Sequence, residues 1–300
     1  MIMASSAKPK HISITLVVDK DKNKVLYAEA ESDFVDILLS FLSLPLGTVS
    51  ELISKDSTAQ PCRFNCITSL YQSSKNLDPK YFYSNEYKGK LLNPTNPMEA
   101  YSEKLVYNLD DTPISQGFHG YLHKPTSFIV SDDLLALVSD LDTTWWMLQN
   151  FRIDFDSERL TVNVTQNEVL DLLKFSLWSE TLLTDLFLRK KLPIPNSQIP
   201  ESELEVNEIK GKEGRKMNLR LMVLKSPRKV LFGEAGEDFT DQLLSFLTIP
   251  LGALEHLSQG KFGLGCIDNL YKSLRRLDPT RDFSSEFYDL KNKLLNPHVA

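Results

Sequence analysis

Two fifteen-residue stretches of the chain share one pattern of apolar and polar positions. The first, DFVDILLSFLSLPLG, covers residues 33–47, and the second, DFTDQLLSFLTIPLG, covers residues 238–252. In the first stretch the apolar residues recur at i, i+3, i+4, i+7 and i+8, which places them on one face of a helix. The pattern predicts an apolar helix in each copy, capped by Asp33 or Asp238 and ended near the Pro-Leu-Gly segment.

A predicted β-hairpin precedes each of these helices. Residues 12–18, ISITLVV, alternate and are rich in β-branched side chains, and residues 25–30, VLYAEA, follow the charged turn DKDKNK. The second copy repeats this hairpin from Met217 with the same 205-residue shift that relates position 33 to position 238. Further on, the copies differ only by short gains and losses in loops, which is typical of a duplicated domain.

The sequence therefore predicts an α+β fold with a duplicated β-hairpin-plus-helices unit and an intervening mixed α/β segment. In chain order we expect a disordered N-terminus, the first unit, a long loop, the middle segment, an exposed linker and the second unit, at residues 1–11, 12–94, 95–127, 128–189, 190–216 and 217–300. The second unit is expected to be a shortened copy. Whether Ala300 is the natural C-terminus is left open.

Charge and cysteine content narrow the classes of partner and the compartment. The chain has 34 Lys and Arg against 40 Asp and Glu, a net charge of -6, which disfavours a nucleic-acid partner. Its apolar runs fall short of the ~20 residues that span a bilayer, so no membrane association is expected. Three cysteines without a secretory signal fit a reducing compartment, the cytoplasm, with the nucleus not excluded.

The strongest candidates for chemistry are acidic residues that recur in both copies, because no known catalytic motif is present. They are Glu29, Asp33, Asp36, Glu234, Asp238 and Asp241. A paired-carboxylate site is one interpretation, and helix capping combined with a solvated helix face is the other. We predict no catalytic residue and no cofactor.

Cysteine and histidine residues form a second set of candidates. Cys66 recurs as Cys266 on an apolar helix face, so both thiols are expected to be buried, whereas Cys62 has no counterpart. His119 and His123 are spaced as two potential metal ligands, and two ligands do not complete a tetrahedral zinc site. We therefore predict no metal centre.

Aromatic residues cluster in two places. The first cluster consists of Tyr81, Phe82, Tyr83 and Tyr87. These rings are expected to pack onto the preceding helices. Trp145 and Trp146 form the second cluster, and because adjacent side chains point in different directions, one ring can reach the surface. We predict a contact patch at these two tryptophans.

Several segments resemble the plant DUF674 family. The resemblance rests on KVLYAEAESDFVDILLSFLSLPLGTVSEL, LLNP, FIVSDDL, EVLDLLKFSLWSETLLTDLFL and KVLFGEAGEDFTDQLLSFLTIPLGALEHL. It implies a plant protein of a family without an established activity. Members often have a Cys-rich, zinc-binding insert between LLNP and FIVSDDL. Residues 112–126 here contain no cysteine, so the resemblance does not extend to the metal, and a surviving metal site is left open.

These observations favour a non-enzymatic protein-interaction or scaffold role with an unknown protein partner. The contacts would be made by exposed hairpin edges and by the tryptophan patch. Duplication favours pseudo-symmetric packing of the two units, within one chain or in a homo-oligomer. The alternative is an enzyme or small-molecule binder that places Glu29 or Asp36 in a pocket with perturbed pKa values.

Overall fold

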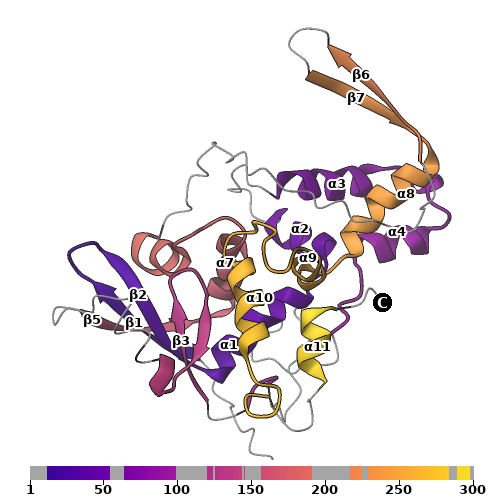
Figure 1. Cartoon of the computed structure of the whole chain (residues 1–300). Helices are drawn as coiled ribbons and strands as arrows, with labels where there is room; N and C mark the ends of the chain where they lie inside the picture. The colour runs from indigo at the N-terminus through magenta and orange to yellow at the C-terminus, as the bar shows by residue number, and fades with distance from the viewer. Residues whose placement is uncertain are drawn as a thin grey trace, which may run out of the picture.

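The molecule combines a five-stranded antiparallel sheet, a separate two-stranded hairpin and a set of helices, so the predicted α+β class is confirmed (Figure 1). The structure is a computed structural model. It describes residues 12–54, 64–98, 120–123, 126–143, 145, 157–190, 217–224, 229–283 and 289–297.

The first hairpin lies inside the large sheet. The strand order is β4-β3-β2-β1-β5, and all neighbouring strands are antiparallel. The strands are β1 (Ile12–Asp19), β2 (Lys24–Glu31), β3 (Ser127–Ser131), β4 (Ala136–Val138) and β5 (Glu158–Val164). Strands of the middle segment therefore occupy both edges of the first hairpin.

Alternation along β1 determines which side chains enter the core. Ile14 and Leu16 lie in the main core with the apolar face of the following helix. Val17 points to the other face of the sheet, where it packs with Tyr27 and Ile129. One face of the first hairpin therefore lies in the main core, and the other carries this small apolar cluster beside the exposed Ser13.

A helix follows each hairpin, as predicted. In chain order they are α1 (Ser32–Ser40), η1 (Phe41–Ser43), α2 (Leu46–Ser54), α3 (Asn65–Asn76), η2 (Pro79–Tyr81), α4 (Asn85–Leu92), α7 (Gln166–Ser176), the π-helical η3 (Thr184–Arg189), α8 (Glu237–Ser245), η4 (Phe246–Thr248), α9 (Leu251–Ser258), α10 (Ile267–Arg276) and α11 (Leu290–Leu295).

The predicted caps of α1 and α8 are wrong. Glu31 and Gly236 occupy the N-cap positions, and neither helix has a side-chain cap hydrogen bond. Asp33 and Asp238 lie two residues after these N-cap positions, in the first turn. There a carboxylate is favoured by the positive end of the helix dipole.

The second hairpin, β6 (Leu219–Leu224) with β7 (Lys229–Ala235), repeats the geometry of the first. All five facing pairs that define β1–β2 recur in β6–β7, 205 positions later. Both hairpins also have a register shift at equivalent positions, after Val17 and after Met222. The duplication predicted from the sequence is therefore present in the backbone.

The Pro-Leu-Gly segments of the two copies pair with each other in the middle of the molecule. Their prolines form an antiparallel bridge. The N–H of Leu46 donates to the carbonyl of Ile249 at 2.9 Å, and the N–H of Leu251 donates to the carbonyl of Leu44 at 3.0 Å. The two donors occupy equivalent positions in the two copies, and so do the two acceptors. The junction therefore has pseudo-two-fold symmetry.

This junction exchanges helices between the two units. Helices α9, α10 and α11 of the second unit pack against α1 and η1 of the first, whereas α2, α3 and α4 of the first pack against α8 and η4 of the second. We call the five-stranded sheet with α1, η1, α7, η3 and α9–α11 lobe A. We call β6–β7 with α8, η4 and α2–α4 lobe B. The two units touch within one chain, as the intramolecular form of the packing prediction requires.

Candidate interaction surface

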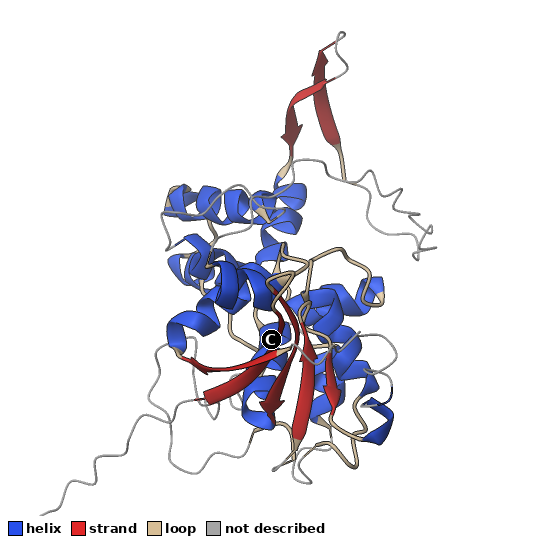
Figure 2. Cartoon of the chain, turned by 90° about the vertical axis from the view of Figure 1, so that its left-hand side faces the viewer, coloured by secondary structure: helices blue, strands red, loops and turns tan. Residues whose placement is uncertain are grey.

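The hairpin of lobe B is uncovered. Every residue of β6 and β7 is exposed, and Figure 2 shows the hairpin standing away from the helices. Within the described parts of the chain, neither edge of this hairpin pairs with another strand. Such an arrangement leaves open backbone edges and apolar side chains in contact with water.

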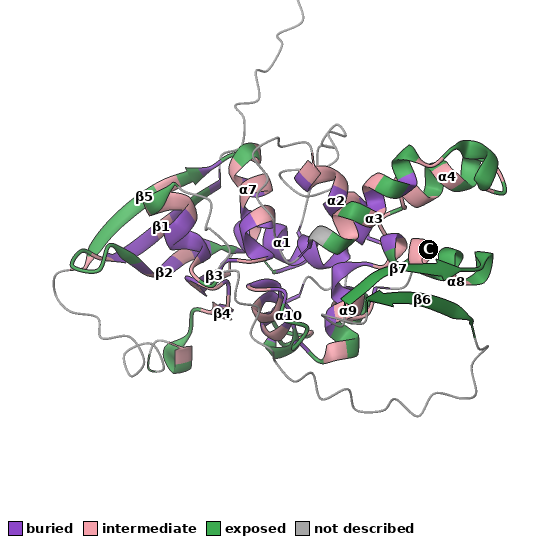
Figure 3. Ribbon diagram, turned by 90° about the horizontal axis from the view of Figure 1, so that it is seen from above, coloured by how far each residue is buried: buried purple, intermediate pink, exposed green. Residues whose placement is uncertain are grey.

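Matched positions in the two hairpins show how different the surroundings are. Leu16 has 0% of its surface exposed, and its counterpart Leu221 has 51%. Val25 is 1% exposed, and its counterpart Val230 is 52% exposed. At these positions the two copies have the same residue type, but only the first copy is buried by other parts of the chain. Figure 3 shows this contrast as buried β1 against exposed β6 and β7.

The helices of lobe B are open as well. Helix α8 contains no buried residue, although almost the whole of its counterpart α1 is buried. In α3, Cys66 is exposed, whereas Cys266 at the N-cap of α10 is buried and its thiol donates to the carbonyl of Ser179 at 2.9 Å. The prediction of a buried thiol is therefore confirmed for Cys266 and wrong for Cys66.

The middle segment explains the asymmetry, because it covers lobe A and occurs once in the sequence. The N–H of Ala136 in β4 donates to Ser273 Oγ of α10 at 2.8 Å. The N–H of Cys266 donates to the carbonyl of Ser176 at 2.8 Å. The counterparts of these α10 residues in α3, Ser73 and Cys66, are exposed. Lobe B thus exposes the surface that the middle segment covers in lobe A.

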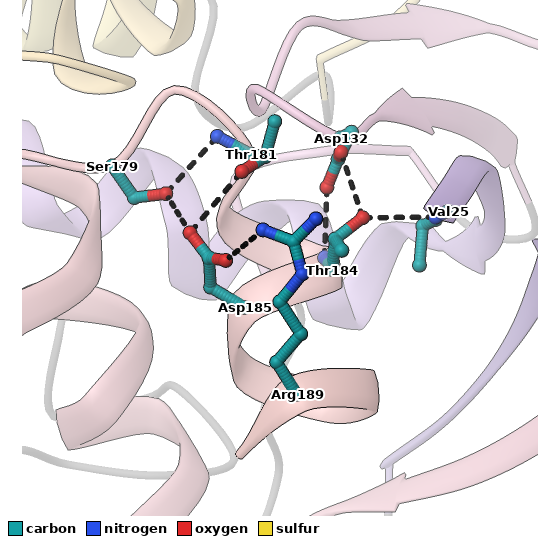
Figure 4. A network of polar contacts seen from close by, with 7 residues as sticks. All are labelled: Val25, Asp132, Ser179, Thr181, Thr184, Asp185 and Arg189. Atoms are coloured by element: carbon teal, nitrogen blue, oxygen red, sulfur yellow. Dashed lines mark hydrogen bonds and ion pairs between the residues drawn. The ribbon is translucent and has the colours of Figure 1, made fainter. Parts of the chain in front are cut away.

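A polar network fastens the middle segment to the first hairpin (Figure 4). Thr184 Oγ1 accepts from the N–H of Val25 at 2.9 Å and donates to Asp132 Oδ2 at 2.8 Å. The N–H of Thr184 donates to Asp132 Oδ1, also at 2.8 Å. Burial raises the pKa of Asp132, and the hydrogen bonds from Thr184 partly offset that effect. The buried acid is satisfied by its partners, which indicates a structural role.

A second acid extends this network along η3. Asp185 Oδ2 accepts from Ser179 Oγ at 2.7 Å and from Thr181 Oγ1 at 3.2 Å, and Arg189 Nη1 donates to Asp185 Oδ1 at 3.0 Å. Both acids come from segments that carry the family resemblance. Their contacts hold the middle segment together and leave no carboxylate oxygen directed at an open site.

The recurring acids are not brought together. Glu29 is half exposed and forms an ion pair with Arg159, and Glu234 is exposed and forms an ion pair with Arg220 at 3.4 Å. Asp36 is fully buried in the core. Because the acids face different environments, they do not make the paired-carboxylate site considered from the sequence.

Asp36 instead ties α1 to the segment that precedes β3. Its Oδ1 accepts from the N–H of Leu122 at 3.0 Å. A Cβ on Gly120 would lie 1.5 Å from Asp36 Oδ2, so only glycine fits at this approach. Burial raises the pKa of Asp36 well above its usual range. Its counterpart Asp241 is exposed, which again reflects the different cover of the two lobes.

Three tyrosines of lobe B are exposed, contrary to the prediction that they pack onto helices. Tyr81, Tyr83 and Tyr87 expose 68%, 93% and 61% of their surface. Tyr83 and Tyr87 stack edge to face with ring centroids 5.6 Å apart, and Lys80 lies 5.0 Å from the ring centroid of Tyr81. These rings add a second apolar feature to lobe B.

The predicted tryptophan patch is described only in part. Trp145 is exposed, and so is the nearby Leu141. Trp146 lies outside the described residues.

The histidines and cysteines considered as ligands do not form a described metal site. His123 is exposed, and its backbone N–H donates to the carbonyl of Asp282 at 2.8 Å. His119 and Cys62 lie outside the described residues. Among the residues that are described, no group of three or more His, Cys, Asp or Glu side chains could hold a metal ion. The described helices are also too short or too polar to cross a membrane.

One family model matches the amino-acid sequence of the chain. A family model described as a protein of unknown function, DUF674, matches residues 8–119 and 117–300. The chain belongs to the DUF674 family. Each match contains one hairpin-plus-helices unit of this DUF674 protein, in agreement with the duplication. No curated protein and no solved structure matches the chain.

Sequence reasoning located only part of the candidate interaction surface. The prediction of exposed edges is wrong for the first hairpin, because β5 and β3 occupy them. It agrees with the structure for the second hairpin. The open faces of α8 and α3 were not predicted. The sequence does contain a signal for these open faces. It has two hairpin-plus-helices units but one middle segment, so one unit is left without this cover.

Proposed function

We propose that this DUF674 protein is a non-enzymatic protein-interaction or scaffold protein whose main binding surface is the β6–β7 hairpin. The observation that supports the proposal is the exposure of an apolar hairpin whose duplicate is paired at both edges and packed against the main core. An isolated two-stranded hairpin is at best marginally stable in water. Open strand edges bind extended segments by adding a strand, and the alternate side chains then select the partner.

The apolar content of the hairpin contributes favourably to such binding. Eight large apolar side chains of β6 and β7 are each about half exposed, and they are Leu219, Leu221, Met222, Val223, Leu224, Val230, Leu231 and Phe232. Full burial of one such side chain stabilises by roughly 1.5–3 kcal/mol, so covering the remaining half adds ~1 kcal/mol for each. The sum is several kcal/mol, which offsets much of the cost of association.

The predicted contact patch at Trp145 and Trp146 is retained as a second, smaller part of this proposal. Trp145 is exposed and therefore available to a partner. We also retain the cytoplasm, or the nucleus, as the proposed compartment. The free thiols of Cys66 and Cys266 are compatible with reducing conditions there.

Quantitative affinity purification of the full chain tests the proposed surface. The variant Leu221→Lys/Val223→Lys places two charges on the hairpin, and Leu257→Lys is the matched control, because Leu257 is a more exposed leucine on α9 of lobe A. Proteins that bind the hairpin should be lost at least tenfold from the first variant and retained by the second. Identical sets of bound proteins for all three chains would refute the proposal.

A further inference from the structure

We infer that the partner of the β6–β7 hairpin is a second copy of this chain, which pairs its β6 antiparallel to the first β6. The inference rests on the proposed function, because it names the occupant of the same surface. The product is a four-stranded sheet, β7-β6-β6-β7, formed across a two-fold axis. One interface of this kind pairs the open β6 edge in both copies.

The choice of a second copy follows from which strands are already in use. Strands β3, β4 and β5 are paired within the five-stranded sheet of lobe A. A second copy could cover lobe B with its middle segment only by exposing its own lobe A. Such an exchange would bury no additional apolar surface. Among the described strands, β4 and β5 also have one open edge each, but β4 is only three residues long and β5 (ERLTVNV) is largely polar. Another β6 (LRLMVL) is the described open edge whose apolar side chains match those of β6 best.

The chemistry of the two edges favours β6. Its sequence, LRLMVL, contains a single charged residue and no proline, so this edge has little protection against pairing. β7 includes Lys229, Gly233 and Glu234, which make it a weaker template. In lobe A, the counterpart edge of β1 accepts seven residues of β5, whereas β2 accepts five residues of β3. The β6 edge therefore corresponds to the longer natural pairing.

The apolar alternation of β6 restricts the register to pairings that keep like faces together, and we place Leu221 on the axis. With Leu221 opposite Leu221 of the second copy, Leu219 faces Val223 and Arg220 faces Met222. Residues that face each other across antiparallel strands have side chains on the same side of the sheet. This register joins the apolar faces of the two hairpins and keeps the two Arg220 side chains from facing each other. A one-residue slip would bring apolar and charged positions together on one face.

The oligomeric state in solution is the first test. Sedimentation of the full chain at ~1–100 µM should give a dimer for the wild type and for Leu257→Lys. Leu221→Lys/Val223→Lys should weaken dimerisation at least a hundredfold. Both side chains are half exposed in one copy, so the variant should retain the far-ultraviolet circular dichroism of the wild type. A wild type that is monomeric throughout, or a dimer that persists in this variant, would overturn the inference.

A disulfide test addresses the register directly. In a Cys62→Ser/Cys66→Ser background, Leu221→Cys places two thiols beside the axis, where oxidation should give a cross-linked dimer. Val230→Cys is the matched control on β7. In the proposed sheet its two copies are three strand spacings apart, ~14 Å, which is too far for a disulfide. Equal cross-linking of both variants, or none at Leu221→Cys, would contradict the register.

Failure of this inference and failure of the proposed function are distinguishable. A monomer that still loses bound proteins through Leu221→Lys/Val223→Lys retains the interaction role and excludes the second copy as its partner. A monomer with unchanged bound proteins excludes both.

Discussion

Thr184 connects three segments of the chain through its backbone and one hydroxyl group. It is fully buried and links η3 to β2 and to the turn after β3. Replacing it by valine would leave the N–H of Val25 and one oxygen of Asp132 without their partner. Thr184→Val should therefore lower the free energy of unfolding by ~1–3 kcal/mol.

Urea denaturation measures this change, and Thr240→Val is the control. Thr240 is exposed in α8, so its substitution should alter stability by no more than ~0.5 kcal/mol. Equal effects of the two substitutions would show that the buried network contributes nothing specific.

Glu255 is the acid for which the structure gives the clearest pH dependence. It is buried in α9, and burial, followed by the charge of Asp268, raises its pKa to about 8. The folded protein therefore keeps this proton up to about pH 8, whereas the unfolded chain releases it near pH 4.5. Because the folded state binds more protons in that window, stability falls as pH rises through it.

Glu255→Gln should remove that fall, since glutamine keeps the shape and cannot ionise. At pH 9 we expect the variant to be more stable than the wild type by roughly 2–4 kcal/mol, with a smaller difference at pH 5. Urea denaturation at the two pH values measures it, with the exposed Glu237→Gln as control. The interpretation fails if Glu255→Gln has the same pH dependence as the wild type.

At the scale of elements, the Pro-Leu-Gly junction depends on close backbone approach. A Cβ on Gly252 would lie 2.8 Å from the carbonyl oxygen of Leu294 and 2.9 Å from that of Leu42. Both are backbone atoms that cannot move aside cheaply. Gly252→Ala should therefore destabilise the protein by ~1–3 kcal/mol.

Gly89→Ala is the control, because nothing lies within 4 Å of the position its Cβ would occupy in α4. Alanine in a helix interior is favoured over glycine, so this variant should be neutral or gain ~0.5–1 kcal/mol. Thermal unfolding of the two variants separates the effects. A Gly252→Ala variant with wild-type stability would show that the backbone segments at the junction can move apart without a loss of stability.

The same elements show how far the sequence could predict the fold. Alternation and helical spacing located the first hairpin and α1, because these patterns are local. The exchange of helices between units could not be predicted, since the two copies have the same apolar spacing and either set of helices would satisfy it. The exposure of Leu221 could not be predicted either. An apolar residue type shows that a side chain favours burial, but it does not show whether another part of the chain packs over it.

At the scale of the whole molecule, each lobe depends on both units. Cutting the chain between residues 200 and 201 would separate α1 from α9–α11 and α8 from α2–α4. We expect the two fragments to copurify as a complex when they are expressed together, and the fragment of residues 1–200 to be poorly folded alone. Circular dichroism and size-exclusion chromatography test this.

Co-expression with a Gly252→Ala version of the second fragment is the control, and it should weaken the complex. Two fragments that each fold independently and do not bind would contradict the exchanged arrangement.

The exchanged junction also determines when the protein can fold on the ribosome. Leu44 and Leu251 are hydrogen-bonded neighbours, yet 207 residues of synthesis separate them. At a synthesis rate of roughly 5–20 residues per second, ~10–40 s pass between the synthesis of α1 and that of the second-unit helices that pack against it. The nascent chain therefore carries a long-lived apolar surface, and holding chaperones should bind it during translation until α11 emerges and closes lobe A.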